Sequence, residues 1–199
     1  MYICRLFHRD RPFEEGFRHV WSTPTGHRFT GCKVFPGHVT DAELRSILGL
    51  PGMRVVILDR RSILRRYVSF QIARRDGQWL STRGPVVDAG SRRLHVDLDH
   101  FLRYRDAVHG SYAAFDRAVV GLPVHRTTYE RLSADLDGEL RRVAAFLGAG
   151  PPATELPPRL ARQNPEPLRA LVSNYDELRD ALEREASAFP RREAWPADA

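Results

Sequence analysis

The stretch from Met53 to Trp79, MRVVILDRRSILRRYVSFQIARRDGQW, decides which fold the sequence predicts. It opens with an unbroken apolar run, Val55 to Leu58, that is rich in β-branched residues. A run without polar alternation is typical of a strand buried on both faces, as in a parallel sheet covered by helices. We therefore expect this strand near the centre of a parallel sheet.

A basic turn and a helix follow this strand. The turn is Asp59-Arg60-Arg61-Ser62, and the apolar residues after it recur at spacings that gather them on one side of a helix: Ile63, Leu64, Tyr67, Val68 and Ile72. In open α/β sheets, ligands bind beyond the carboxyl ends of the strands. Helix N-termini at that edge offer free N–H groups to an anion. Two arginines at this junction therefore favour an anionic ligand.

The remaining elements complete an α/β pattern. We expect helices over 41–48, 97–119 and 136–147, a strand over 124–132, a proline-rich segment over 149–167 and a final helix after 174. Thr40 or Asp41 is suited to cap the first helix, and Asn174 with Glu177 resembles a capping box for the last. Together these elements predict three layers, a parallel sheet with helices on both faces.

Length and composition restrict the class of protein. The 199 residues predict a single domain over 1–190 with a loose tail over 191–199. No apolar run reaches the ~20 residues that span a bilayer, and no signal peptide is recognised. Cys4 and Cys32, the only cysteines, give neither a disulfide framework nor a metal-ligand cluster. The expectation is a cytoplasmic protein without a metal.

The charge balance calls for an anionic partner. The formal net charge is +6, and every basic side chain except Lys33 is an arginine. These arginines are spread along the chain without a nucleic-acid recognition motif, which argues against nucleic acid as the partner.

The Met53–Trp79 segment resembles the 3′-phosphate-binding strand–turn–helix of sulfotransferases that use 3′-phosphoadenosine 5′-phosphosulfate (PAPS). The resemblance is greatest to the bacterial nodulation-type carbohydrate sulfotransferases. In that pattern an arginine after the strand and a serine two helical turns later hold the 3′-phosphate, and Arg61 and Ser69 have the matching spacing. A guanidinium can bind a phosphate with two hydrogen bonds, and a hydroxyl can donate one more. From the two residues alone, Arg61 could equally be a solvated surface charge and Ser69 a surface hydroxyl.

Downstream segments repeat the family pattern in order. Tyr129–Leu132 (YERL) and Phe146–Gly148 (FLG) resemble its Y-E-x-L and F-L-G segments. Arg162 and Gln163 resemble the start of the loop that closes over the nucleotide, although a solvated linker remains open there. The resemblance covers roughly residues 31–185 and implies the P-loop NTPase-like fold of sulfotransferases.

The resemblance also suggests catalytic residues. Lys33 matches the lysine of a G-x-K strand, here the predicted strand 31–35, and could neutralise charge on the transferring sulfonate. His38 lies where some family members place a catalytic base, a role suited to an imidazole. Glu14 and Glu15 are other candidates for the base. A lysine reaching solvent and a surface histidine are the ordinary alternatives.

One part of the family pattern has no match. Sulfotransferases begin with a strand, a Ser/Gly-rich loop around the 5′-phosphosulfate, and a helix. Ser22 to Gly26 have some of the right residue types but leave no room for that helix before the next strand, so we interpret them as a turn. Relative to the family, we expect an N-terminally truncated chain that transfers sulfonate poorly by itself.

Three functions follow, in order of preference. The first is a PAPS-dependent sulfotransferase acting on a hydroxyl of a carbohydrate or glycolipid, without a metal. The second is a non-catalytic protein of the same fold that binds an adenosine 3′-phosphate nucleotide. The third is an arginine-rich nucleic-acid binder.

Overall fold

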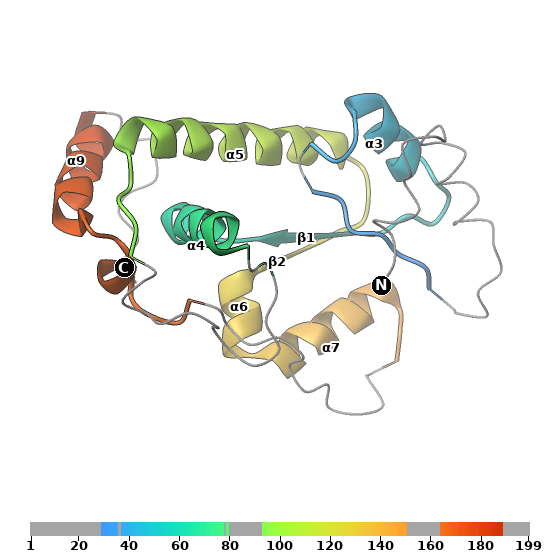
Figure 1. Cartoon of the computed structure of the whole chain (residues 1–199). Helices are drawn as coiled ribbons and strands as arrows, with labels where there is room; N and C mark the ends of the chain where they lie inside the picture. Colours follow the sequence, from blue (N-terminus) through green and yellow to red (C-terminus); the bar gives the residue numbers. More distant parts are fainter. Residues whose placement is uncertain (1–28, 36, 78, 80–92, 151–163, 189–199) are drawn as a thin grey trace. The chain divides into compact units, whose positions relative to one another are not determined.

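The computed structural model describes residues 29–35, 37–77, 79, 93–150 and 164–188. Its elements, in chain order, are α3, β1, α4, α5, β2, α6, α7, α8 and α9 (Figure 1). The chain divides into two compact units, one formed by Met1–Val55 and Ser111–Val124 and the other by Val56–Gly110 and His125–Ala199. The predicted single domain over 1–190 stays a prediction.

Helix α3 (Asp41–Leu48) belongs to the first unit and begins with a capping box. The Thr40 hydroxyl accepts a hydrogen bond from the Glu43 N–H, and the Glu43 carboxylate accepts one from the Thr40 N–H at 2.7 Å. This confirms the predicted start of the helix at Thr40. The predicted strand over 31–35 is wrong, because these residues make no β-ladder with the described part of the chain.

Strands β1 (Val55–Asp59) and β2 (Val124–Thr128) form a small parallel sheet. Burial on both faces was expected for β1, and this is wrong: Val56 is 39% and Leu58 is 45% exposed. Alternate side chains of a strand point to opposite faces, and only the face of Val55, Ile57 and Asp59 is partly covered. An apolar run shows that the side chains of a strand favour burial, but it does not show whether a helix covers each face of that strand. The α/β class holds, and the three-layer arrangement stays a prediction.

The predicted strand over 124–132 is too long. It ends at Thr128, whose hydroxyl accepts a hydrogen bond from the Arg131 N–H and thereby caps α6 (Tyr129–Ala134). Threonine suits both a strand and a helix N-cap, and here the cap ends the strand. Helix α7 (Leu136–Leu147) follows and ends at Gly148, which has a positive φ of 73°.

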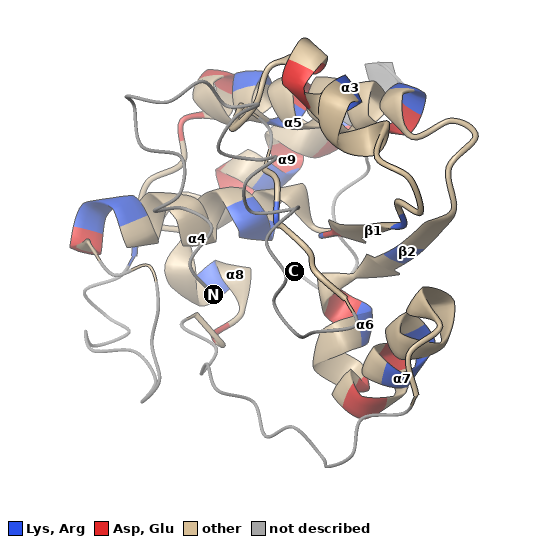
Figure 2. Cartoon of the chain, turned by 90° about the vertical axis from the view of Figure 1, so that its right-hand side faces the viewer, with Lys and Arg blue, Asp and Glu red and all other residues tan. Residues whose placement is uncertain are grey.

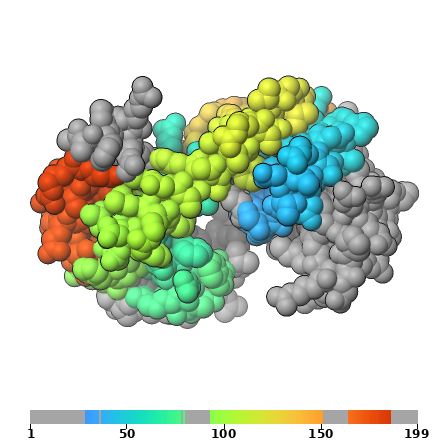
Figure 3. Space-filling model, turned by 90° about the horizontal axis from the view of Figure 1, so that it is seen from above, coloured from blue at the N-terminus to red at the C-terminus, as the bar shows by residue number. Residues whose placement is uncertain are grey.

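Helix α4 (Ile63–Asp76) confirms the predicted amphipathic pattern, because all five predicted apolar residues are buried. It packs beside the N-terminal half of α5 (Leu98–Ala118), as Figure 3 shows. The Tyr67 ring lies 5.4 Å from that of Phe101 and 5.2 Å from that of Tyr104. The Tyr67 hydroxyl also lies 2.6 Å from Nδ1 of His100. Burial in this contact raises the pKa of Tyr67.

The C-terminal elements contribute most of the fully buried apolar side chains. Helix α8 (Leu168–Leu171), the residue after it and α9 (Tyr175–Ala188) contribute the buried side chains of Leu168, Leu171, Val172 and Leu178. Leu94 and Val172 form a parallel bridge. The Asn174 side chain extends that pairing, accepting from the Val96 N–H and donating to the Val96 carbonyl, both at 2.9 Å. The predicted capping box of Asn174 and Glu177 is therefore wrong, because the Asn174 amide is used by Val96.

None of the helices within the described ranges is long and apolar enough to cross a membrane.

Candidate functional site

The junction between β1 and α4 is held by its own side chains. The Asp59 carboxylate accepts a hydrogen bond from the Arg60 N–H at 2.6 Å. The Ser62 hydroxyl caps α4 by accepting from the Arg65 N–H at 3.2 Å. The turn therefore presents a helix N-terminus, with its partial positive charge, at the carboxyl end of β1.

Arg61 and Ser69 are both placed by this junction. Arg61 is exposed, and within the described part of the chain its guanidinium has no hydrogen-bond or ion-pair partner. Ser69 is half-buried two turns into α4, and its hydroxyl likewise has no partner among the described residues. Arg61, Arg65 and Ser69 follow one another at four-residue intervals, which places Arg65 and Ser69 next to each other on one side of α4. That Arg61 and Ser69 share one ligand stays a prediction.

Arg65 was missed by the sequence reasoning. Its guanidinium donates to the carbonyl of Glu166 at 3.0 Å and to that of Asn164 at 3.5 Å, and Asn164 is buried. Arg162 and Gln163 lie outside the described residues, but the segment directly after them is attached to α4 between Arg61 and Ser69. Arg65 is the third arginine of the motif and follows Arg61 by four residues, and this spacing could have identified it from the sequence.

The first turn of α6 contacts the same junction. The Arg60 guanidinium lies over the Tyr129 ring, 4.6 Å from its centroid. The Glu130 carboxylate accepts a hydrogen bond from the Arg61 N–H at 3.2 Å. The YERL segment thus lies against the predicted phosphate-binding turn.

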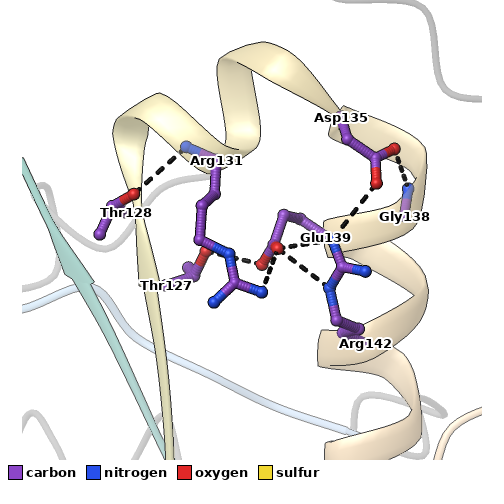
Figure 4. A network of polar contacts seen from close by, with 7 residues as sticks. All are labelled: Thr127, Thr128, Arg131, Asp135, Gly138, Glu139 and Arg142. Atoms are coloured by element: carbon purple, nitrogen blue, oxygen red, sulfur yellow. Dashed lines mark hydrogen bonds and ion pairs between the residues drawn. The ribbon is translucent and has the colours of Figure 1, made fainter.

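A buried carboxylate holds α6 to β2 and α7 (Figure 4). Glu139 is 0% exposed and accepts hydrogen bonds from the Thr127 hydroxyl at 2.7 Å and from the Arg142 guanidinium at 2.6 Å. Arg131 forms an ion pair with it at 2.7 Å. The Thr127 hydrogen bond, together with the arginines, lowers the pKa of Glu139 to about 2, against the opposing effect of burial. Helices α6 and α7 carry charges of both signs at this place (Figure 2).

Lys33 and His38 belong to the first unit, and the structure brings them to one aromatic ring. The Lys33 ammonium lies 4.4 Å from the centroid of the Phe35 ring, and the His38 ring meets that ring edge-on at 4.9 Å. Both side chains are exposed. The predicted roles of these residues stay predictions.

Other candidates cannot be placed. Glu14, Glu15 and Ser22–Gly26 lie outside the described residues. Among the residues that the structure describes, no three histidine, cysteine or acidic side chains gather in a way that could hold a metal ion.

Comparison with known proteins gives one kind of relative. The chain is similar to two proteins called Nodulation protein H, one from Rhizobium meliloti strain 1021 and one from Rhizobium meliloti. Each is 34% identical over 159 residues, which cover 75% of this chain and 61% of the relative. The chain thus spans less than two thirds of the length of these relatives. No protein-family model matches the chain, and no solved structure matches it significantly.

Proposed function

We propose that the chain is a sulfotransferase of the bacterial nodulation type, which transfers a sulfonate from PAPS to a hydroxyl of a carbohydrate or glycolipid. The observation that carries the proposal is the exposed Arg61 guanidinium, which has no partner in the described part of the chain, at the start of α4. Two findings agree with it: the PAPS-type motif in the sequence and the similarity to Nodulation protein H.

The donor set suits a phosphate. Arg61 offers paired N–H donors and Ser69 offers a hydroxyl, and neither group is taken by another residue that the structure describes. In the proposal these two side chains hold the 3′-phosphate, and Arg162 and Gln163 close over the nucleotide. The hydrogen bonds from Arg65 to the segment that begins at Asn164 support this placement of the loop.

Transfer itself needs positioning and charge neutralisation. PAPS, when bound, supplies an activated sulfonate. Lys33 is proposed to offset the negative charge that gathers during transfer, and His38 to accept the proton of the acceptor hydroxyl. Their shared contact with Phe35 is compatible with these roles, because it leaves both polar groups exposed.

The second candidate is a non-catalytic protein that binds an adenosine 3′-phosphate nucleotide through Arg61 and Ser69. It keeps the same nucleotide site but requires nothing of Lys33 and His38.

An assay with labelled PAPS and a mixed pool of glycan acceptors separates the two candidates. The proposal expects slow but measurable transfer of label to the glycan fraction, in keeping with the poor transfer expected of this chain by itself. That transfer should fall at least tenfold in Arg61→Ala and Lys33→Ala. It should be unchanged in Arg74→Ala, which removes an exposed arginine from the other end of α4. Nucleotide binding that depends on Arg61, without any transfer, would favour the non-catalytic candidate. If nucleotide binding does not depend on Arg61, both are wrong.

A further inference from the structure

The first turn of α6 touches the β1–α4 turn through two consecutive residues. Tyr129 places its ring against the Arg60 guanidinium, and Glu130 accepts a hydrogen bond from the Arg61 N–H. One contact holds the end of the Arg60 side chain, and the other holds the backbone N–H of Arg61, which belongs to the peptide bond that joins the two arginines.

Glu130 contacts the backbone of Arg61 and not its side chain. No ion pair joins the Glu130 carboxylate to the Arg61 guanidinium, although the two residues are hydrogen-bonded. An acid that paired with the guanidinium would compete with a phosphate for it. A hydrogen bond to the N–H instead fixes the point from which the side chain starts and leaves the guanidinium available.

Polar contacts hold the residues on either side of Glu130. Thr128 caps α6 one residue before Tyr129. Arg131, the residue after Glu130, is paired with the buried Glu139, which also binds Thr127 at the end of β2 (Figure 4). The residues on both sides of Glu130 are therefore tied to β2 and α7, and a carboxylate carried on such a turn can define the position of its partner.

We propose that Glu130 is a positioning residue for anion binding: by accepting from the Arg61 N–H, it orients the β1–α4 turn so that the Arg61 guanidinium meets the nucleotide phosphate. This inference rests on the proposed function. The acceptor oxygen matters in this arrangement, and the negative charge of Glu130 does not.

Calorimetric titration of the full chain with adenosine 3′,5′-bisphosphate tests the proposal. Glu130→Ala is expected to weaken binding about fivefold, the scale of one net hydrogen bond. Glu130→Gln keeps an acceptor oxygen and is expected to bind within about twofold of the unsubstituted chain. Glu177→Ala, which removes an exposed carboxylate from the first turn of α9, is the control and is expected to change nothing.

A double-mutant cycle distinguishes positioning from a general loss of structure. In the Arg61→Ala background, Glu130→Ala is expected to have no further effect on affinity, because the side chain that it positions is gone. Amide hydrogen exchange at residue 61 is expected to accelerate in Glu130→Ala and to stay slow in Glu130→Gln. Urea unfolding confirms that each variant is folded.

The outcomes distinguish a failure of the proposed function from a failure of the positioning role of Glu130. If Arg61→Ala leaves binding unchanged, the proposed function is wrong. If Arg61→Ala weakens binding but Glu130→Ala does not, or weakens it equally in both backgrounds, only the positioning role is wrong. Tighter binding by Glu130→Gln would also contradict it, because the charge of Glu130 would then act by repulsion.

Discussion

Replacing Glu185 by alanine should destabilise the second unit by leaving a buried arginine without its main partner. Arg105, on α5, is 2% exposed. Its two Nη atoms donate to the two carboxylate oxygens of Glu185, on α9, at 2.6 and 3.0 Å. The hydrogen bond to Glu185 is the largest of the effects that raise the pKa of Arg105. The pair also joins α9 to the N-terminal half of α5 (Figure 1).

The size of the effect depends on the burial of the ion pair and on the hydrogen bonds that Arg105 keeps after the substitution. Removing one partner of a buried ion pair typically costs about 3–5 kcal/mol. Asp106 still accepts from Arg105 at 3.0 and 3.1 Å, and the Glu185 side chain is 15% exposed, so water can reach part of the site. We therefore expect the low end of the range, a loss of about 3 kcal/mol in the free energy of unfolding.

Urea unfolding followed by circular dichroism measures this loss from the midpoint and slope. Glu183→Ala is the matched control on the same helix, because its exposed carboxylate lies 3.8 Å from Arg179 and should contribute less than about 0.5 kcal/mol. Arg105→Met replaces the charged side chain by an apolar one, and it should lower the free energy of unfolding by less than Glu185→Ala does. A loss below about 1 kcal/mol in Glu185→Ala would refute the reasoning.

Two further predictions concern the polar contacts of the second unit. The folded pKa of Glu139, about 2, lies below its ordinary value of 4.5, so its contribution to stability is present above pH 4.5 and is lost as the pH falls toward 2. Glu139→Gln should therefore unfold with a flatter pH dependence over this interval, and an unchanged acid limb in urea titrations would contradict this. Asn174→Ala should cost about 2 kcal/mol by leaving the Val96 N–H and carbonyl unpaired, whereas Asn174→Asp, which can still accept from the N–H, should cost less.

Local signals in the sequence predicted helices α3, α4, α5, α7 and α9, but not α6, whose residues were expected in a strand, nor α8. The cap of α3 at Thr40 and the apolar face of α4 depend on residues close in sequence, and each is present as predicted. The strand of the central motif was found for the same reason. The expectation that both faces of this strand are buried was wrong, because burial depends on what the rest of the chain places against Val56 and Leu58.

Most of the candidate site depended on contacts across the chain. The motif located Arg61 and Ser69, and the structure places Arg61 at the carboxyl end of β1. The hydrogen bond from Arg61 to Glu130 joins residues 69 apart in sequence, and Arg65 meets residues about a hundred positions away. Contacts between residues so far apart leave no periodic pattern in the sequence from which they could be predicted. Asn174 shows the same limit, because its side chain, although suited to capping a helix, binds the backbone of Val96 instead.

The central claim is that Arg61 binds the 3′-phosphate of the nucleotide. Calorimetric titration of the chain and of its folded Arg61→Ala variant with adenosine 3′,5′-bisphosphate tests it most directly. We expect Arg61→Ala to weaken binding by about 1.5–3 kcal/mol, the scale of hydrogen bonds to a charged group, and Arg74→Ala to bind as the unsubstituted chain does. Equal affinity of Arg61→Ala and the unsubstituted chain would show that Arg61 does not bind the 3′-phosphate.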